Sequence, residues 1–468
     1  LEPDKAYEDG RGQEHYLAQF THVSSANQAC VEDVISEQYD QETGVWPESP
    51  GYAFGVTDNI LRLAQLVYNA TGEDLVARYP LLEKAALLIF QYLFPNGRTV
   101  GFGDTNHNVP PAVMSELLIA RARRIGDLET ERRLTLALKR QMERSGYRRD
   151  EERSLFALTA YVDELVEGHT VGENLATRTF FAKSVNVFIQ RNGDHPRFGL
   201  MASLSGTEGG HAHASGMALE LYGQGLIQGA DPGNGVSYWQ KEHAEYYARF
   251  PAHNTVVVDG ISHHHKDNDR GTFKHVSQIL DVEPEPGVRR ALSQDVSFVD
   301  VVFHETKTDA DQRRLVALVR TSAETGYYVD IFRSRRRDGE DRKHEYLYHN
   351  LGQSLTLYDD SGEPLNSQPT AELGSAHGDL VGYDYFTEKQ AVTHDGDFTG
   401  RFRVVLEESP DVDMRVWMGG CPGRTLFAVK APWARTTRSG SAPPELQNVP
   451  MPTLVVRQEG EAWDRPFV

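Results

Sequence analysis

The chain has 468 residues, of which 39% are hydrophobic and 25% are charged, a balance that is typical of globular proteins. Its net charge of -20 argues against general nucleic-acid binding, because there is no broad basic field to attract phosphate. The sequence has no apolar run long enough to span a membrane. Two cysteines, Cys30 and Cys421, form neither a disulfide framework nor a cysteine zinc signature.

The first part of the chain, up to about residue 165, has the spacing of amphipathic helices. The stretch "SANQACVEDVISEQY" opens with Ser25 as an N-cap, and "TDNILRLAQLVYNATG" begins near Asp58 and stops at Gly72. Two later segments, "PPAVMSELLIARARRIG" and "DLETERRLTLALKRQMERSG", are joined by a very short link at Gly126. Helices with such short connections predict antiparallel helix pairs.

Beyond about residue 170 the hydrophobic period changes to two. Val185, Val187 and Ile189 alternate with other residues, and further strand-like runs follow between turn signals. This pattern predicts a large antiparallel β-sandwich. The fold class is therefore α+β and multidomain, with a helical domain over residues 1–168 and a sandwich over residues 169–468.

The stretch "GGHAHASGM" places His211 and His213 two residues apart. In an extended strand both would point from one face, about 7 Å apart. Asp231 follows in a Gly/Pro turn, and His253 in "PAHNTVVVDG" heads another strand. Zinc favours imidazole nitrogen and carboxylate oxygen, so the spacing suggests a metal site or a proton-transfer site. The alternative is that these are separate structural histidines.

Two Gly-rich stretches between predicted helices could line a cleft. "GVWPESPGYAFG" carries Trp46, Glu48 and Tyr52 on a predicted loop, which suits sugar binding, although the aromatic rings could equally cap the helices. "GFGDTNHN" carries Asp104 and His107, where Asp104 is better explained as an N-cap or turn residue.

The tract "SHHHKD", which contains His263–His265, could suggest a metal site. Its position after Gly260 favours a solvated loop or a loop at the rim of a cleft.

Together these residues resemble the heparinase II/III-like polysaccharide lyases, which include oligoalginate lyases and relate to dermatan sulfate epimerases. The most specific stretch is "HAHASGMALELYGQGLIQGADPGNG", followed by the "AHNTVVVDG" run. The resemblance implies an incomplete (α/α) toroid followed by a large antiparallel β-sandwich. It also implies β-elimination on a uronate polysaccharide such as heparan sulfate, alginate, ulvan or chondroitin. A C5-uronyl epimerase and a non-catalytic carbohydrate-binding relative remain the alternatives.

The resemblance also implies roles for individual residues. His213, Asp231 and His253 would bind a divalent ion, Zn²⁺ or a similar metal, in a structural role. Tyr52 and His211 would transfer protons on opposite faces of the sugar, and Tyr238 is a second candidate for an aromatic acid or a contact to substrate. Candidate contacts to substrate follow from proximity to these loops: Trp46, Glu48, His107, Arg98, Arg249 and Lys266.

The chain departs from the family pattern at two points. Ser215 stands where the family often has Asp, and the residue that would neutralise the substrate carboxylate falls at or before Leu1. We therefore expect an N-terminally truncated toroid. The resemblance further predicts a periplasmic or secreted protein with an acidic polysaccharide as partner, no nucleic acid, no membrane span and, as an open option, a homodimer.

Overall fold

The computed structural model describes residues 2–145, 147–149, 160–167, 175–262, 277–288, 290–438 and 440–468. The chain forms two compact units. The first comprises Leu1–Pro47, Tyr52–Phe90 and Pro110–Leu175, and the second comprises Glu48–Gly51, Gln91–Val109 and Ala176–Val468. The predicted boundary between residues 168 and 169 lies outside the described residues, so it stays a prediction.

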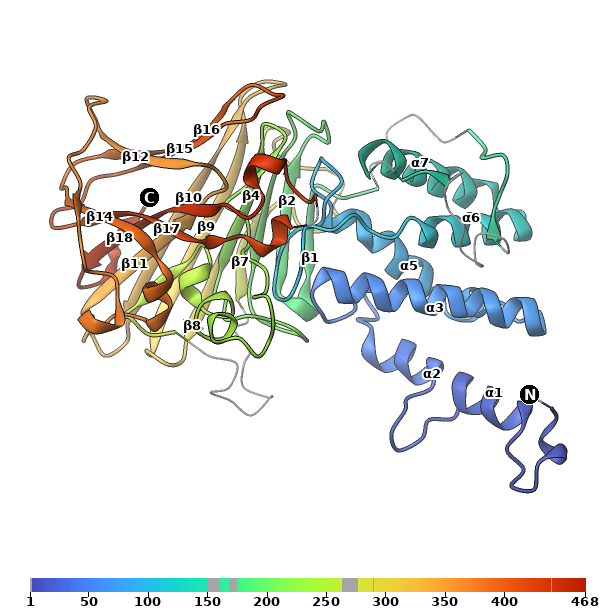
Figure 1. The fold of residues 1–468 in the computed structure, drawn as a ribbon. Coiled ribbons are helices and arrows are strands. Elements are labelled where there is room, and N and C mark those ends of the chain that lie inside the picture. The colour runs from blue at the N-terminus through green and yellow to red at the C-terminus, as the bar shows by residue number, and fades with distance from the viewer. Residues whose placement is uncertain are drawn as a thin grey trace. The chain divides into compact units, whose positions relative to one another are not determined.

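Helices dominate the first unit (Figure 1). They are α1 (Gln13–Thr21), α2 (Val31–Asp33), α3 (Pro50–Thr71), α4 (Leu75–Arg78), α5 (Leu81–Leu87), α6 (Val113–Ile125) and α7 (Leu128–Ser145). The link between α6 and α7 is as short as predicted. Gly126 adopts a left-handed conformation there, and its N–H closes the last turn of α6 on the carbonyls of Ala122 and Arg123.

Two predicted helix starts differ from the structure. Helix α3 begins at Pro50 rather than near Asp58, because proline is well suited to the first turn of a helix. Tyr52 therefore lies in the first turn of α3 and not on a loop. Helix α2 is capped by Cys30, whose sulfur accepts the N–H of Asp33, and not by Ser25. The last predicted helix, "ERSLFALTAYVDEL", lies largely outside the described residues.

The second unit contains four antiparallel sheets (Figure 1). The first is β1 (Thr179–Ala182), β2 (Val187–Asn192), β3 (Leu200–Ser205), β4 (Ala218–Gly223) and β5 (Leu226–Gln228). The second is β19 (Ala462–Phe467), β10 (Gly326–Arg336), β9 (Ala310–Arg320), β8 (Val296–Glu305) and β7 (Gln278–Glu283). The third is β13 (Gln368–Pro369), β14 (Thr387–Thr393), β17 (Thr425–Trp433), β18 (Pro450–Glu459), β11 (Lys343–His349) and β6 (Val256–Val258). The fourth is β12 (Ser354–Asp359), β15 (Phe398–Val404) and β16 (Val412–Met418).

One hydrophobic core is shared by the four sheets. Leu204, Val316, Leu454 and Phe402 come from the first, second, third and fourth sheet in that order, and all are buried in the same cluster. Burial of each such side chain contributes about 1.5–3 kcal/mol, so the strands form a firm platform for the loops between them. A helical region followed by antiparallel sheets confirms the predicted fold class.

The strand pairing brings three sequence-distant loops to one end of the first sheet. The β3–β4 ladder ends at the pair Ser205 and Ala218, and the connection between them carries the His-x-His stretch. Strand β5 pairs back on β4, so the segment that follows β5 leaves from the same end. The N–H of Leu219 in β4 donates to the carbonyl of Asn254, just before β6. The chain order of the strands therefore gathers the predicted metal ligands.

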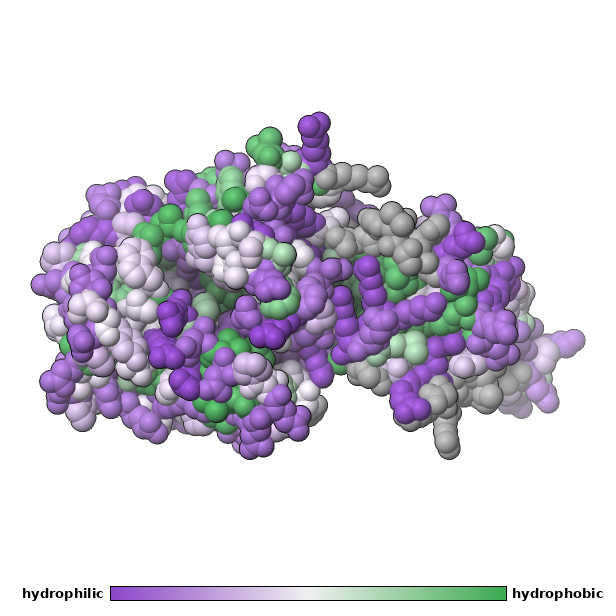
Figure 2. Space-filling model, turned by 90° about the horizontal axis from the view of Figure 1, so that it is seen from above, coloured by the Kyte–Doolittle hydropathy of each residue, from purple (hydrophilic) through white to green (hydrophobic). Residues whose placement is uncertain are grey.

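On the face shown in Figure 2, hydrophilic residues cover most of the surface of each unit and hydrophobic residues form small separate patches. Within the described part of the chain, no helix has both the length and the apolar character that crossing a bilayer requires.

Candidate functional site

The two histidines of the His-x-His pair do not share a strand face, contrary to the prediction. Residues 206–217 form a loop in which Gly209, His211 and Gly216 all have positive φ angles. A left-handed residue turns the chain, so side chains two apart no longer point the same way. The His211 side chain is 34% exposed, whereas that of His213 is 2% exposed. One ring can therefore face a ligand in solution while the other is built into the interior.

Hydrogen bonds within the loop fix this arrangement. The Thr207 hydroxyl lies 2.6 Å from the carbonyl oxygen of His213 and 3.0 Å from the Ser215 hydroxyl. Ser215 also donates to the carbonyl of Gly206 at 3.1 Å. Ser215, which stands where the family often has Asp, thus closes the loop on itself.

His211 is paired with Glu48. Its Nδ1 lies 3.3 Å from Oε1 of Glu48, and the backbone of Glu48 forms an isolated parallel bridge with Gly210. When Nδ1–H donates to the carboxylate, Nε2 keeps its lone pair and can accept a proton. Glu48, predicted as a contact to substrate, is therefore placed to orient His211.

A second loop, residues 101–108, packs against the backbone of His211. The N–H of Asp104 donates to the His211 carbonyl at 2.9 Å. Gly103 has a φ of +63°, and a Cβ added there would lie 2.2 Å from the same carbonyl oxygen. Only glycine allows both the left-handed backbone and this close approach.

Gly103→Ala is therefore expected to destabilise the fold by about 1–3 kcal/mol and to displace the His211 loop. Denaturant unfolding would measure the loss. Gly423→Ala is the matched control, since Gly423 has a φ of +78° with no atom within 4 Å of an added Cβ. Equal losses of stability in the two variants would show that the close approach to His211 carries no cost of its own.

The side chain of Asp104 forms a hydrogen bond with the ring of His213. The Nε2 atom of His213 lies 2.9 Å from Oδ1 of Asp104, and the Tyr238 hydroxyl bonds the same carboxylate. Burial alone would raise the pKa of this carboxyl, but the bonds from His213 and Tyr238 and the charges of His213 and His243 lower it. Asp104 is thus an ionised acceptor among donors, and not the predicted N-cap.

Asp231 and His253 form a similar buried pair. Nδ1 of His253 lies 3.2 Å from Oδ2 of Asp231, and Oδ1 of Asp231 accepts the N–H of Gly233 at 2.9 Å. Burial raises the pKa of the Asp231 carboxyl, but the bond from His253 and the charges of His253 and His213 bring it below its usual value. The rings of His213 and His253 are 5.7 Å apart.

Unpartnered nitrogen atoms in this cluster fit a metal. Nδ1 of His213 and Nε2 of His253 are buried and make no hydrogen bond. Imidazole nitrogen and carboxylate oxygen are the donor types that zinc prefers, and Asp231 contacts His253 through Nδ1, which leaves Nε2 of that ring for a metal. A single unpartnered nitrogen is not specific for a metal, because His344 also has an unpartnered Nδ1 while its Nε2 contacts Asp341. We therefore consider a metal only where the rings of two such histidines lie close together.

The described residues offer a second possible ligand set, formed by Asp104, His213 and His243, whose ligand atoms lie within 4.8 Å of one another. Nδ1 of His243, however, accepts the N–H of Gly235 at 3.1 Å. The proton of the neutral ring then sits on Nε2, so the ring offers no free lone pair to a metal beside Asp104. This hydrogen bond disfavours His243 as a ligand.

Glu220 in β4 forms hydrogen bonds to the segments that carry Asp231, His107 and Gly101. Its Oε1 accepts the N–H of Asp231 at 3.0 Å and contacts Nε2 of His107 at 2.7 Å, while Oε2 accepts the N–H of Gly101 at 2.7 Å. The His107 side chain is fully buried in this network. A ring without exposed surface cannot touch a polysaccharide. The prediction that His107 contacts the substrate is therefore wrong for this structure.

The other predicted residues lie as follows. Trp46 and Tyr52 belong to the first unit, where Trp46 packs edge-on against Tyr39 and Tyr52 is 40% exposed. The prediction that Tyr52 faces His211 stays a prediction. Arg249 is half-buried and donates to the carbonyl of Ala244, and Arg98 donates to the carbonyl of Gly440. Lys266 and the tract His263–His265 lie outside the described residues.

Sequence reasoning missed four buried polar residues around the histidine cluster: His243, Glu220, Asn254 and His349. Asn254 anchors His349, whose Nδ1 lies 3.0 Å from its Oδ1, and burial lowers the pKa of His349 to about 3. Asn254 and Glu220 stand inside quoted motifs, so their polarity within apolar runs was a usable signal. His243 begins a short π-helical turn and His349 ends β11, and no spacing in the sequence marks either of them.

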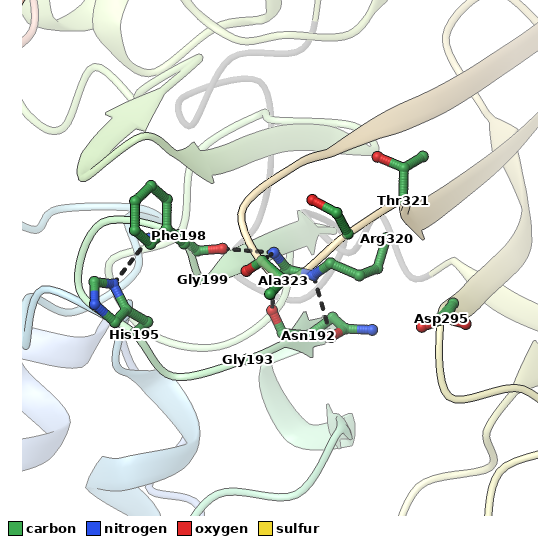
Figure 3. A pocket seen from close by; sticks show the side chains of 10 residues that line it. Asn192, Gly193, His195, Phe198, Gly199, Asp295, Arg320, Thr321 and Ala323 are labelled. Carbon is green, nitrogen blue, oxygen red and sulfur yellow. Dashed lines mark hydrogen bonds between the residues drawn. The ribbon is translucent and has the colours of Figure 1, made fainter.

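A separate polar pocket of about 420 Å³ lies in the second unit (Figure 3). None of its lining residues belongs to the histidine cluster. The Arg320 guanidinium donates to the carbonyls of Phe198 and Asn192, and burial lowers the pKa of this arginine. Its charge is therefore engaged in holding the loop at 193–199 to the end of β9.

Two consecutive segments of the chain match known families. Residues 42–179 match the family described as endo-acting ulvan lyase 2nd domain, and residues 181–316 match the family described as heparinase II/III-like, C-terminal. An endo-acting ulvan lyase of Formosa agariphila is 26% identical over 487 residues, which cover 98% of this chain and 58% of that protein. The chain thus spans a little over half the length of this relative.

Solved structures agree in fold. The crystal structure of a heparan sulfate lyase from Pedobacter heparinus superposes with a TM-score of 0.51 at 12% identity, over 92% of this chain and 52% of that chain. A mutant of the same lyase gives the same TM-score at 13% identity. Two consecutive family matches, and the similarity to the ulvan lyase over 98% of this chain, make the chain similar to the heparinase II/III-like polysaccharide lyases.

Proposed function

We propose that this chain cleaves a uronate-containing polysaccharide by β-elimination, with ulvan as the leading substrate. One observation carries the proposal: a part-exposed His211 is held 3.3 Å from Glu48 in a chain similar to an endo-acting ulvan lyase. An oriented, accessible imidazole is what removal of a weakly acidic C–H proton requires.

The reaction needs three events at one uronate. A base removes the proton from C5, the electron pair forms the C4–C5 double bond, and the C4–O4 bond breaks as an acid protonates O4. His211, with Nδ1 on Glu48, would accept the C5 proton at Nε2. Tyr52 would protonate O4, or serve as both base and acid where proton and leaving group share a face. Tyr238, whose hydroxyl bonds Asp104, is the second candidate for the acid.

A divalent ion, Zn²⁺ or similar, would be held by His213, Asp231 and His253. When bound, it would supply a fixed positive charge that ties three segments of the second unit together. His211 and the metal ligand His213 lie two residues apart in the same loop, so an ion that fixes His213 would also limit the movement of His211. The metal would thus support the base and need not touch the substrate.

Further features of the proposal concern the polymer. Trp46 and Arg249 remain candidate contacts to the sugar and to its acidic groups. We place the protein in the periplasm or outside the cell, because an intact polysaccharide is too large to cross a membrane unaided. A homodimer stays an open option.

The test is the ultraviolet absorbance of an unsaturated uronate on incubation with ulvan, heparan sulfate, alginate and chondroitin sulfate. We expect absorbance to rise with ulvan and to stay flat with carboxyl-reduced ulvan, whose C5 proton has lost its acidifying group. Solvent deuterium at C5 without cleavage would instead identify an epimerase. Retention on the polymer with neither change would identify a binding protein.

A further inference from the structure

We propose that Asp104 is a positioning residue for the metal ligand His213 and couples the metal to the loop that carries His211. The inference rests on the divalent ion of the proposed function. It assigns a role to a carboxylate that neither the sequence pattern nor the expected ligand set includes.

The first step concerns the hydrogen positions on His213. An ionised carboxylate only accepts hydrogen bonds, so the 2.9 Å contact with Oδ1 of Asp104 places the proton of the neutral ring on Nε2. The lone pair then lies on Nδ1, the buried atom without a hydrogen-bond partner. Carboxylates commonly hold metal-binding histidines in this manner, which fixes both the tautomer and the ring orientation.

The second step is that Asp104 is better suited to this role than to direct ligation. Its carboxylate already accepts bonds from His213 and Tyr238. A metal at the set formed by Asp104, His213 and His243 would have to take a lone pair from His243, whose Nδ1 already accepts the N–H of Gly235.

The third step is the connection to the proposed base. The backbone N–H of Asp104 donates to the carbonyl of His211, and its own carbonyl accepts the Ser49 hydroxyl at 3.0 Å. Ser49 adjoins Glu48, the partner of His211. Asp104 therefore bonds the metal ligand through its side chain, and through its backbone it bonds the proposed base His211 and Ser49, the neighbour of Glu48.

The experiment measures zinc affinity by competition with a chromogenic chelator, without any polysaccharide. Asp104→Asn is expected to weaken zinc binding about 10- to 100-fold, as loss of a carboxylate behind a ligating histidine does. Asp341→Asn is the matched control. Asp341 lies 2.8 Å from Nε2 of buried His344, whose Nδ1 is likewise unpartnered, and the zinc affinity of this variant should equal that of the wild type.

A second pair of measurements separates positioning from ligation. His243→Gln should keep wild-type zinc affinity, and Co²⁺ bound to Asp104→Asn should keep the wild-type visible spectrum, because the ligands are unchanged. Loss of zinc binding in His243→Gln, or a changed cobalt spectrum, would make Asp104 a ligand and overturn the inference. Undiminished zinc affinity in folded Asp104→Asn would overturn it equally.

Two outcomes keep this inference distinct from the proposed activity. Wild-type protein that binds one zinc but cleaves no uronate polymer would refute the lyase proposal and leave the role of Asp104 intact. Wild-type protein that binds no zinc would refute the role of Asp104. If Asp104→Asn does not fold, Asp104→Glu retains the charge while moving the carboxylate by one methylene, and its zinc affinity should fall in the same direction.

Discussion

Tyr52→Phe is expected to lower turnover on a uronate polysaccharide by about 100-fold or more, because it removes a general acid or base while keeping the aromatic ring. The Tyr52 side chain is 40% exposed in the first turn of α3, so it is not part of the buried core. Folding should therefore be unchanged. Initial rates of double-bond formation, together with circular dichroism, would measure both effects.

Tyr16→Phe provides the control, since Tyr16 is a comparably exposed tyrosine of the same unit. Its turnover should equal that of the wild type. Near-wild-type turnover in Tyr52→Phe would move the proton transfer elsewhere, and Tyr238→Phe would be measured next. If Tyr52→Phe were destabilised so far that unfolded protein accounted for its lower turnover, the hydroxyl would have a structural role instead.

Removal of the divalent ion is expected to destabilise the second unit by about 4 kcal/mol when free zinc stands at about 1,000 times its dissociation constant. The physical reason is that ligation joins three segments that the unfolded chain keeps apart: the β3–β4 loop, the turn after β5 and the start of β6. The melting temperature should fall by about 10 °C on treatment with a chelator and recover when zinc is restored.

The ligand variants provide the control for this prediction. Asp231→Asn and His253→Gln should melt lower than the wild type and should no longer respond to the chelator. Elemental analysis of the purified wild type should find about one ion per chain. A wild type without an ion, or with a melting temperature that the chelator leaves unchanged, would contradict the proposed site.

Local sequence patterns were sufficient where the physical cause is itself local. The pair α6 and α7 was predictable because periodic apolar residues define each helix and Gly126 supplies the left-handed turn between them. The change to a period of two after about residue 170 predicted antiparallel strands for the same reason. The start of α3 was misjudged because Pro50 fits the first turn of a helix as well as a loop.

The sequence by itself determined the residue types of the candidate site and the resemblance to the heparinase II/III-like polysaccharide lyases. Tertiary structure alone decided which of these residues contact one another. Asp104 meets His213 across 109 residues, and Glu48 meets His211 across an even longer separation, through strand pairing that no local pattern encodes. The His-x-His pair divides into one accessible and one buried ring because a left-handed residue turns the chain at His211. The contacts of such side chains depend on which sequence-distant groups lie within hydrogen-bond distance, and the packing of the folded chain determines those groups.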